Sequence, residues 1–121
     1  MAKLVLLVHT LESIRAEVAA ALRHAGYEVL EFADTMPAIS ALEGVRRPNL
    51  LITRIKYPPG SPTGISLAGM AMVKCPGIKT IITGDPALEE YAAGLGEFHP
   101  HPIDVPRLVA EVERLMSGCE K

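Results

Sequence analysis

Two different periods of apolar residues alternate along this chain. The run Leu-Val-Leu-Leu-Val at residues 4–8 contains no polar position, which is typical of a strand that is covered on both faces in a parallel sheet. Residues 11–25 follow, and they place their apolar side chains on one helical stripe, made by Leu11, Ile14, Val18, Ala21 and Leu22. Gly26 comes next, where a helix end favours a residue able to adopt positive φ.

The rest of the chain repeats this alternation. Further strands are predicted over residues 27–32, 49–53, 80–83 and, more weakly, 97–101, and further helices over residues 36–42, 65–73, 88–93 and from Asp104 onward. Asp104 can cap the last helix, with Pro106 in its first turn. Five strands alternating with five helices predict one doubly wound α/β domain over residues 1–121, with a parallel sheet and right-handed crossovers.

Such folds bind ligands at the carboxyl ends of their strands. The polar residues that follow the predicted strands are therefore the candidates for chemistry, and they are His9, Thr10, Arg54, Thr83 and His101.

Composition narrows the classes of partner. The net charge of −2 argues against nucleic acid or an anionic membrane as partner, since both require a basic surface. No apolar run is long enough for a signal peptide or a membrane span. Cys75 and Cys119 form no CxxC pair, which indicates reduced thiols in a cytoplasmic protein. We expect a cytoplasmic, stand-alone domain, because no linker or second domain is visible.

Several stretches carry a resemblance to a known family. The resemblance lies in Gly26-Tyr27-Glu28-Val29, residues 48–58, Thr83-Gly84 and Phe98-His99-Pro100-His101-Pro102. In this order they resemble the receiver domain of two-component response regulators, over essentially the whole chain. The resemblance implies a flavodoxin-like (βα)5 fold with strand order 2-1-3-4-5, a place in phosphorelay signal transduction, and a cis peptide bond between His101 and Pro102.

The departures from the family concern its reactive residues. The resemblance implies that the acidic pair which holds Mg²⁺ is replaced by His9 and Thr10, the phosphoacceptor aspartate by Arg54, and the lysine by His101. The switch-like positions Thr83 and Phe98 are kept. An arginine is permanently cationic and cannot attack phosphorus, and Mg²⁺ needs carboxylate ligands. We predict a degenerate pseudo-receiver with no catalytic residue, no metal and no cofactor.

Arg54 has three possible roles on this reasoning. Its guanidinium can fill the space of the metal and phosphoryl group and fix the switch in one state. Together with His9, His101 and Thr83 it can form an anion-binding site, because an arginine fork matches carboxylate or phosphate. It can also simply point to solvent or pair with a nearby acid.

Two other segments invite a functional interpretation. His99, His101 and His9 suggest a metal site, but Pro100 and Pro102 interrupt the segment and no other ligand completes it, so solvated histidines at the sheet edge are the simpler expectation. Residues 57–64, about two longer than in the family, form either a recognition loop that exposes Tyr57 and prolines or a passive insertion. Residues 83–94 are shorter by about four residues, or one helical turn, which puts the family's usual dimer in doubt.

The leading hypothesis is a stand-alone, phosphorylation-independent receiver-like module that acts by protein–protein contact. Its partner would be a histidine kinase, another regulator or a second copy. The first alternative is a small-anion-binding module that uses Arg54. The second, an enzyme on a flavodoxin-like scaffold, is disfavoured because the sequence has no GxGxxG, P-loop or nucleophile elbow.

Overall fold

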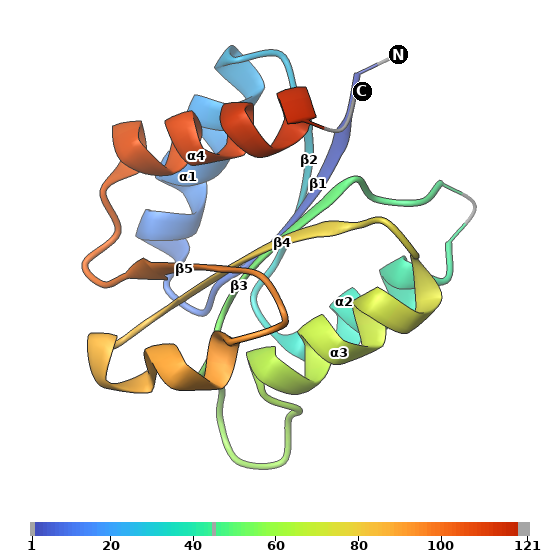
Figure 1. Cartoon of the computed structure of the whole chain (residues 1–121), viewed down its shortest axis with the longest axis vertical. Coiled ribbons are helices and arrows are strands. Elements are labelled where there is room, and N and C mark those ends of the chain that lie inside the picture. The colour runs from blue at the N-terminus through green and yellow to red at the C-terminus, as the bar shows by residue number, and fades with distance from the viewer. Residues whose placement is uncertain (1, 45, 119–121) are drawn as a thin grey trace.

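The computed structural model describes residues 2–44 and 46–118. Its centre is a five-stranded parallel sheet in the order β2-β1-β3-β4-β5 (Figure 1). The strands are β1 (Leu4–Val8), β2 (Glu28–Phe32), β3 (Leu50–Arg54), β4 (Lys79–Gly84) and β5 (Glu97–Pro100). This confirms the predicted doubly wound α/β fold and its strand order.

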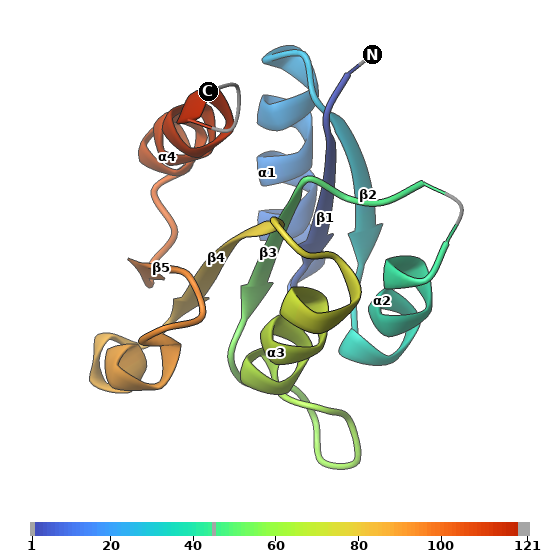
Figure 2. The ribbon, with the colours of Figure 1, turned by 45° about the vertical axis from the view of Figure 1, so that its right-hand side comes forward.

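Helices cover both faces of the sheet. They are α1 (Glu12–His24), α2 (Thr35–Leu42), α3 (Gly64–Lys74), the 3-10 helix η1 (Pro86–Ala92) and α4 (Val105–Gly118). In Figure 2, α1 and α4 lie on one side of the sheet and α2 and α3 lie on the other. The described chain therefore has three layers, with the carboxyl ends of all strands at one edge.

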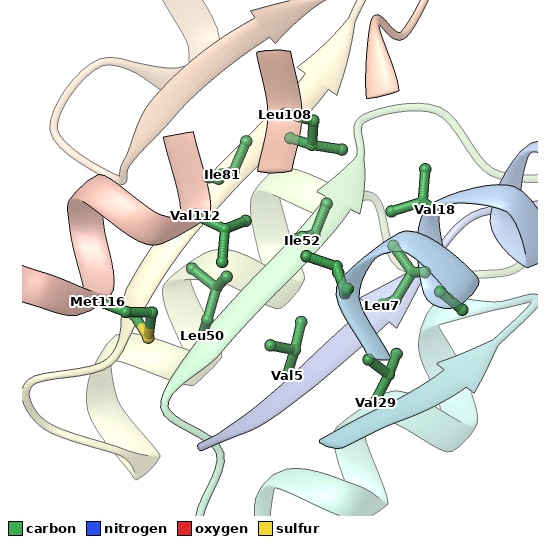
Figure 3. Packing of buried hydrophobic residues seen from close by; sticks show 12 residues of the cluster. Val5, Leu7, Val18, Val29, Leu50, Ile52, Ile81, Leu108, Val112 and Met116 are labelled. Atoms are coloured by element: carbon green, nitrogen blue, oxygen red, sulfur yellow. The ribbon is translucent and has the colours of Figure 1, made fainter. Parts of the chain in front are cut away.

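Each face of the sheet has its own apolar core. Alternate residues of β1 point to opposite faces, so Val5 and Leu7 pack under α1 and α4, and Leu6 and Val8 pack under α2 and α3. Figure 3 shows the first of these cores, where Leu108, Val112 and Met116 of α4 meet the strands. The uninterrupted apolar run of β1 follows from this burial on both faces.

Two elements near the carboxyl edge of the sheet differ from the predicted ones. The third strand runs one residue further than predicted and ends on Arg54, which lies in register with Thr83 of β4. The fourth helix is a 3-10 helix that begins at Pro86, two residues before the predicted start, and the carboxylate of its capping residue Asp85 accepts from the Ala87 N–H at 2.8 Å. A tight, short helix thus lies beside β4 and β5.

The expectation that His99 is a solvated edge residue was wrong. Its side chain is 1% exposed because α4 covers this end of β5. The Nδ1 atom of His99 lies 2.9 Å from Oε1 of Glu111, and its Nε2 accepts from the Asp104 N–H at 3.1 Å. In the neutral ring Nδ1 therefore donates to the carboxylate. Both ring nitrogens are used in joining β5 to α4.

The cis peptide bond, the cap of the last helix and the cysteines were also subjects of prediction. The His101–Pro102 bond is cis, as predicted, and Asp104 caps α4 by accepting from the Arg107 N–H at 3.2 Å. Cys75 is buried and free, whereas Cys119 lies outside the described residues. Across residues 2–44 and 46–118, no helix has both the length and the apolar character needed to cross a bilayer.

Candidate functional site

The structure brings the candidate residues together at the carboxyl edge of the sheet. Arg54 ends β3, and its Nη1 donates to Oγ1 of Thr10, beyond the end of β1, at 2.7 Å. The rings of His9 and His101 lie with their centroids 5.9 Å apart. Thr83 is paired with Arg54 in the sheet register. One guanidinium and two imidazoles therefore share a small space.

Arg54 crosses the gap between two strands and does not extend into solvent. Its side chain is half-buried, and its Nε is buried with no hydrogen-bond partner among the described residues. No acidic side chain in the described part of the chain forms an ion pair with it. The positive charge of Arg54 is thus held at the edge by a neutral hydroxyl.

The imidazoles beside Arg54 are held in the neutral form. Burial, followed by the charges of Arg54, His101 and Arg15, lowers the pKa of His9 from 6.5 to about 4. Burial and then Arg54 also lower the pKa of His101. Nδ1 of His9 accepts from the Leu11 N–H at 3.1 Å, so the proton of the neutral ring is on Nε2. At neutral pH, Arg54 carries the charge of this cluster.

The two switch-like residues, Thr83 and Phe98, lie on the neighbouring strands β4 and β5. Thr83 is fully buried, and its hydroxyl has no hydrogen-bond partner within the described chain. Phe98 is partly buried and packs against the core under α3. A Cβ added to Gly84 would lie 3.2 Å from Ile55 and 3.7 Å from Phe98. The small residue after Thr83 thus lets Ile55 and Phe98 approach the strand.

Tyr57 belongs to the site, so it does not provide the exposed apolar surface that the recognition-loop alternative required. Its hydroxyl donates to the Val8 carbonyl at 2.9 Å, lies 2.8 Å from Oγ1 of Thr53, and accepts from the Arg54 N–H at 3.3 Å. Burial raises the pKa of Tyr57 to about 12, so it stays a neutral donor. A tyrosine before two prolines carries no sequence signal that it turns inward.

The rest of the loop is tied down as well. Thr35 donates to the Pro62 carbonyl at 2.6 Å, and the Ser61 hydroxyl donates to Asp34 at 3.0 Å. At the end of the loop, a Cβ on Gly64 would lie 1.8 Å from the Arg54 carbonyl oxygen, so only glycine fits there. The loop is fixed at both ends against the site and the start of α2.

Arg54 and His101 form a wall between two pockets. The larger pocket, of about 430 Å³, is also lined by Lys56, Asp85 and Pro102. The smaller one, of about 180 Å³, lies toward α1 and includes His9 among its lining residues. The site therefore opens to either side of the guanidinium.

Structural comparison places the fold among signalling domains. Neither a protein-family sequence model nor a curated protein matches the sequence. The structure resembles a response regulator receiver protein from Sinorhizobium medicae, at 21% identity and TM-score 0.87 over 98% of this chain and 97% of that one. It also resembles the Vibrio cholerae chemotaxis protein CheY4, at 21% identity and TM-score 0.82 over 95% and 99%.

A third comparison shows similarity in sequence as well as in fold. The receiver domain of the hybrid histidine kinase CckA is 31% identical, with a TM-score of 0.77, and the match covers 93% of this chain and 98% of that domain. This chain belongs to the response-regulator receiver family. The receiver fold of two-component systems was thus correctly predicted from the sequence.

The Mg²⁺ ion that the family implies does not fit the groups at this edge of the receiver. Mg²⁺ takes oxygen ligands and usually at least one carboxylate. The side chains that meet here are a guanidinium, two imidazoles and hydroxyls, with Arg54 directly bonded to Thr10. One carboxylate, that of Asp85, lines the larger pocket beside them. Within the described ranges, no three His, Cys, Asp or Glu residues gather in a group that could hold a metal ion.

Replacing Tyr57 by Phe is expected to destabilise the receiver by about 1–2 kcal/mol. The change removes one hydroxyl and leaves the buried Val8 carbonyl without this donor. Urea denaturation measures the loss. The matched control is Tyr91→Phe, at a side chain that is 57% exposed, which should stay within about 0.5 kcal/mol of wild type. Equal denaturation midpoints for Tyr57→Phe and wild type would contradict this role.

Acid is expected to destabilise the receiver partly through His9. The unfolded chain binds a proton at this residue near pH 6.5, but the folded chain does so only near pH 4. Stability is therefore complete above about pH 6.5 and falls as the pH drops toward 4, by on the order of 2 kcal/mol for this residue.

The test compares wild type with His9→Asn, whose side-chain oxygen can still accept from the Leu11 N–H but does not titrate. Unfolding free energies measured from pH 7 to 4 should fall less steeply for the variant. Parallel curves would show that His9 titrates normally in the folded state. This control is needed because the carboxylates also contribute to acid unfolding.

Proposed function

We propose that this receiver acts without phosphorylation, as a module that signals through protein–protein contact. The observation that supports this most directly is the bond from Arg54 Nη1 to Thr10 Oγ1 at 2.7 Å. In this proposal Arg54 occupies the position of the phosphoacceptor, and His9 and Thr10 occupy the positions of the acidic pair. The partner is a histidine kinase, another regulator or a second copy of the chain.

The chemistry of the edge argues against an acyl phosphate. Phosphoryl transfer to a receiver needs a carboxylate nucleophile and a cation that offsets charge on the phosphoryl oxygens. Arg54 supplies a cation but no nucleophile, because its guanidinium does not lose a proton in proteins. Nδ1 of His9 accepts from a backbone N–H, and Asp85, which lines the same pocket as His101, already accepts from the Ala87 N–H. The site thus holds a fixed charge and no reactive group.

The hydrogen bonds of Arg54 and Tyr57 also bear on the state of the domain. Arg54 joins the end of β3 to the segment after β1, and Tyr57 joins the loop after β3 to the same two strands. We infer that the carboxyl edge is kept in one arrangement, so that the surface presented to a partner does not depend on a covalent signal.

Acetyl phosphate or beryllofluoride with Mg²⁺ is expected to leave the receiver unmodified. Intact mass spectrometry after acetyl phosphate and amide NMR spectra after beryllofluoride measure this. A receiver that carries the full acidic set, treated in parallel, verifies the reagents. A gain of one phosphoryl group by this chain would overturn the proposal.

Arg54→Asp alone is expected to remain unlabelled as well. This variant restores a carboxylate at the end of β3, but His9 and Thr10 still offer no carboxylate to Mg²⁺. Labelling of the single variant that depends on Mg²⁺ would show that the metal position is elsewhere.

A second candidate function is reversible binding of a small oxyanion. It is favoured by the larger pocket, which brings Arg54 and Lys56 together with the single carboxylate of Asp85, and that carboxylate already accepts from the Ala87 N–H. Arginine pairs well with carboxylate or phosphate oxygens. A bound anion would also oppose the effect of Arg54 at His101 and raise the pKa of this imidazole.

Calorimetric titration with inorganic phosphate and with sulfate tests this second candidate. Binding should weaken at least about tenfold in Arg54→Met, the loss of one charge-assisted contact. Lys79→Met, which removes an exposed cation at the opposite edge of the sheet, should bind as wild type does. No heat with either anion at millimolar concentration, or equal weakening in both variants, would rule the site out.

A further inference from the structure

A third pocket lies next to the larger of the two pockets beside Arg54. Its volume is about 510 Å³, and the two pockets share Ile55, Lys56 and Leu88 among their lining residues. The end of β3 lies between η1, drawn in orange, and α3 in both Figure 1 and Figure 2. The two pockets are therefore neighbours on one surface. This surface, called the β3–η1 groove below, is defined by Arg54, Lys56, Ile65, Asp85, Leu88 and Tyr91.

One half of the groove carries a positive charge that the described chain does not neutralise. Nη1 of Arg54 is bonded to Thr10, but no hydrogen bond within the described chain uses its Nη2. Lys56 is exposed and forms no ion pair with a described acid. Arg54 and Lys56 contribute two positive charges and Asp85 one negative charge, so one positive charge remains while His101 is neutral.

The other half of the groove is apolar. Ile65 at the start of α3 and Leu88 of η1 are partly buried and pack on the core, and each leaves part of its side chain at the surface. Tyr91 of η1 stands beside them with 57% of its surface exposed. Tyrosine is enriched in protein interfaces, because its ring offers a large apolar area and its hydroxyl a polar end. Lys56 lies between this half and the charged half.

The charge and the apolar half together select the class of occupant. A single carboxylate matches one remaining positive charge, whereas a phosphate monoester carries a charge near −2 and would also meet the carboxylate of Asp85. Nucleic acid needs several phosphate contacts from a larger basic surface. A free anion uses none of the apolar half. An acidic side chain with a large apolar neighbour in the same peptide uses both halves.

We propose that the β3–η1 groove binds a peptide segment of a partner protein in which an Asp or Glu side chain lies beside a large apolar side chain. The carboxylate accepts from Nη2 of Arg54 and from Lys56. The apolar side chain packs against Ile65, Leu88 and Tyr91. The inference rests on the proposed function and deepens it, because it names the chemistry of the partner and the surface that it binds.

The groove is shallow, so a short segment should bind weakly. Lys56 and Tyr91 are both exposed, and pairs between exposed charges gain little free energy because water and salt screen them. A short peptide also loses conformational freedom when it binds. We expect a dissociation constant on the order of 0.1–1 mM at low salt, and weaker binding as salt is added.

Amide NMR of the isotope-labelled receiver, titrated with short peptides, tests the proposal without Mg²⁺ or a phosphoryl donor. The probe is a pool of acetylated and amidated pentapeptides Gly-X-Asp-X-Gly, in which X is Leu, Ile or Phe. Chemical shifts should change mainly along the β3–η1 groove. The pool with Asn in place of Asp should bind at least about tenfold more weakly, since it lacks the charge-assisted contacts. The pool with Ser at both X positions should also bind more weakly.

Two variants of the receiver test the two halves separately. Lys56→Met should weaken binding of the Asp pool at least about tenfold, and Tyr91→Ser at least about fivefold. Lys79→Met and Val73→Ser are the matched controls. Lys79 is an exposed cation at the opposite edge of the sheet, and Val73 is an apolar residue of α3 with 80% of its surface exposed. Neither lines the groove, so both controls should bind as wild type does.

Three results would overturn the proposal. The first is no change of shift in the groove with the Asp pool at millimolar concentration. The second is equal binding of the Asp and Asn pools. The third is binding of acetate or inorganic phosphate as tight as that of the peptides and unaffected by Tyr91→Ser, which would leave only a site for small anions.

The failure of this inference can be distinguished from a failure of the proposed function. A receiver that is labelled by acetyl phosphate but still binds the Asp pool through Lys56 and Tyr91 would refute only phosphorylation independence. A receiver that resists labelling and does not bind the Asp pool would refute only the peptide site.

Discussion

One positive charge at the end of β3 determines what the carboxyl edge of this sheet can do. The guanidinium of Arg54 lies where three strand ends meet, and its Nη1 donates to the neutral hydroxyl of Thr10 and not to an acid. Its field helps to keep His9 and His101 neutral, so the two imidazoles add no further charge. Cation, neutral rings and buried hydroxyls do not match the carboxylate ligands that Mg²⁺ prefers, and this mismatch is the basis of the proposal that the receiver acts without phosphorylation.

Tyr57 adds hydrogen bonds that hold the backbone beside Arg54. Its hydroxyl reaches the backbone of β1 and of Arg54, and it also contacts Thr53. The bonds at Thr35 and Ser61 then hold the far side of the same loop. The loop after β3 is therefore an anchored part of the domain, which suits a surface that is presented to a partner without a change of state.

The fold could be predicted from the sequence because its strands are buried on both faces and its helices on one. Such burial leaves uninterrupted apolar runs such as residues 4–8 and stripes such as that of α1. The residues of the edge could be located for the same reason, because parallel strands place their ends together. Local sequence does not determine what covers a strand from elsewhere in the chain. His99 was misjudged for that reason, since α4 provides both its cover and its partner Glu111.

The direction of a side chain is equally invisible in the sequence. Tyr57 in a loop rich in proline and glycine has the pattern of an exposed residue, but its hydroxyl accepts from the Arg54 N–H and donates to the Val8 carbonyl. The type of the fourth helix could not be predicted, because an aspartate cap and a proline in the first turn begin 3-10 helices and α-helices alike. The lowered pKa of His9 could not be predicted from the sequence, because it arises from burial and from the charges of Arg54 and His101, which lie far from His9 in the chain.

The charge of Arg54 is part of the polypeptide, and this has a consequence for control in time. A phosphoryl group can be added and hydrolysed within the lifetime of one molecule, whereas a guanidinium is present from synthesis to degradation. If the edge is held by Arg54, the number of copies that the cell makes and destroys becomes a direct means of adjusting the output of this domain.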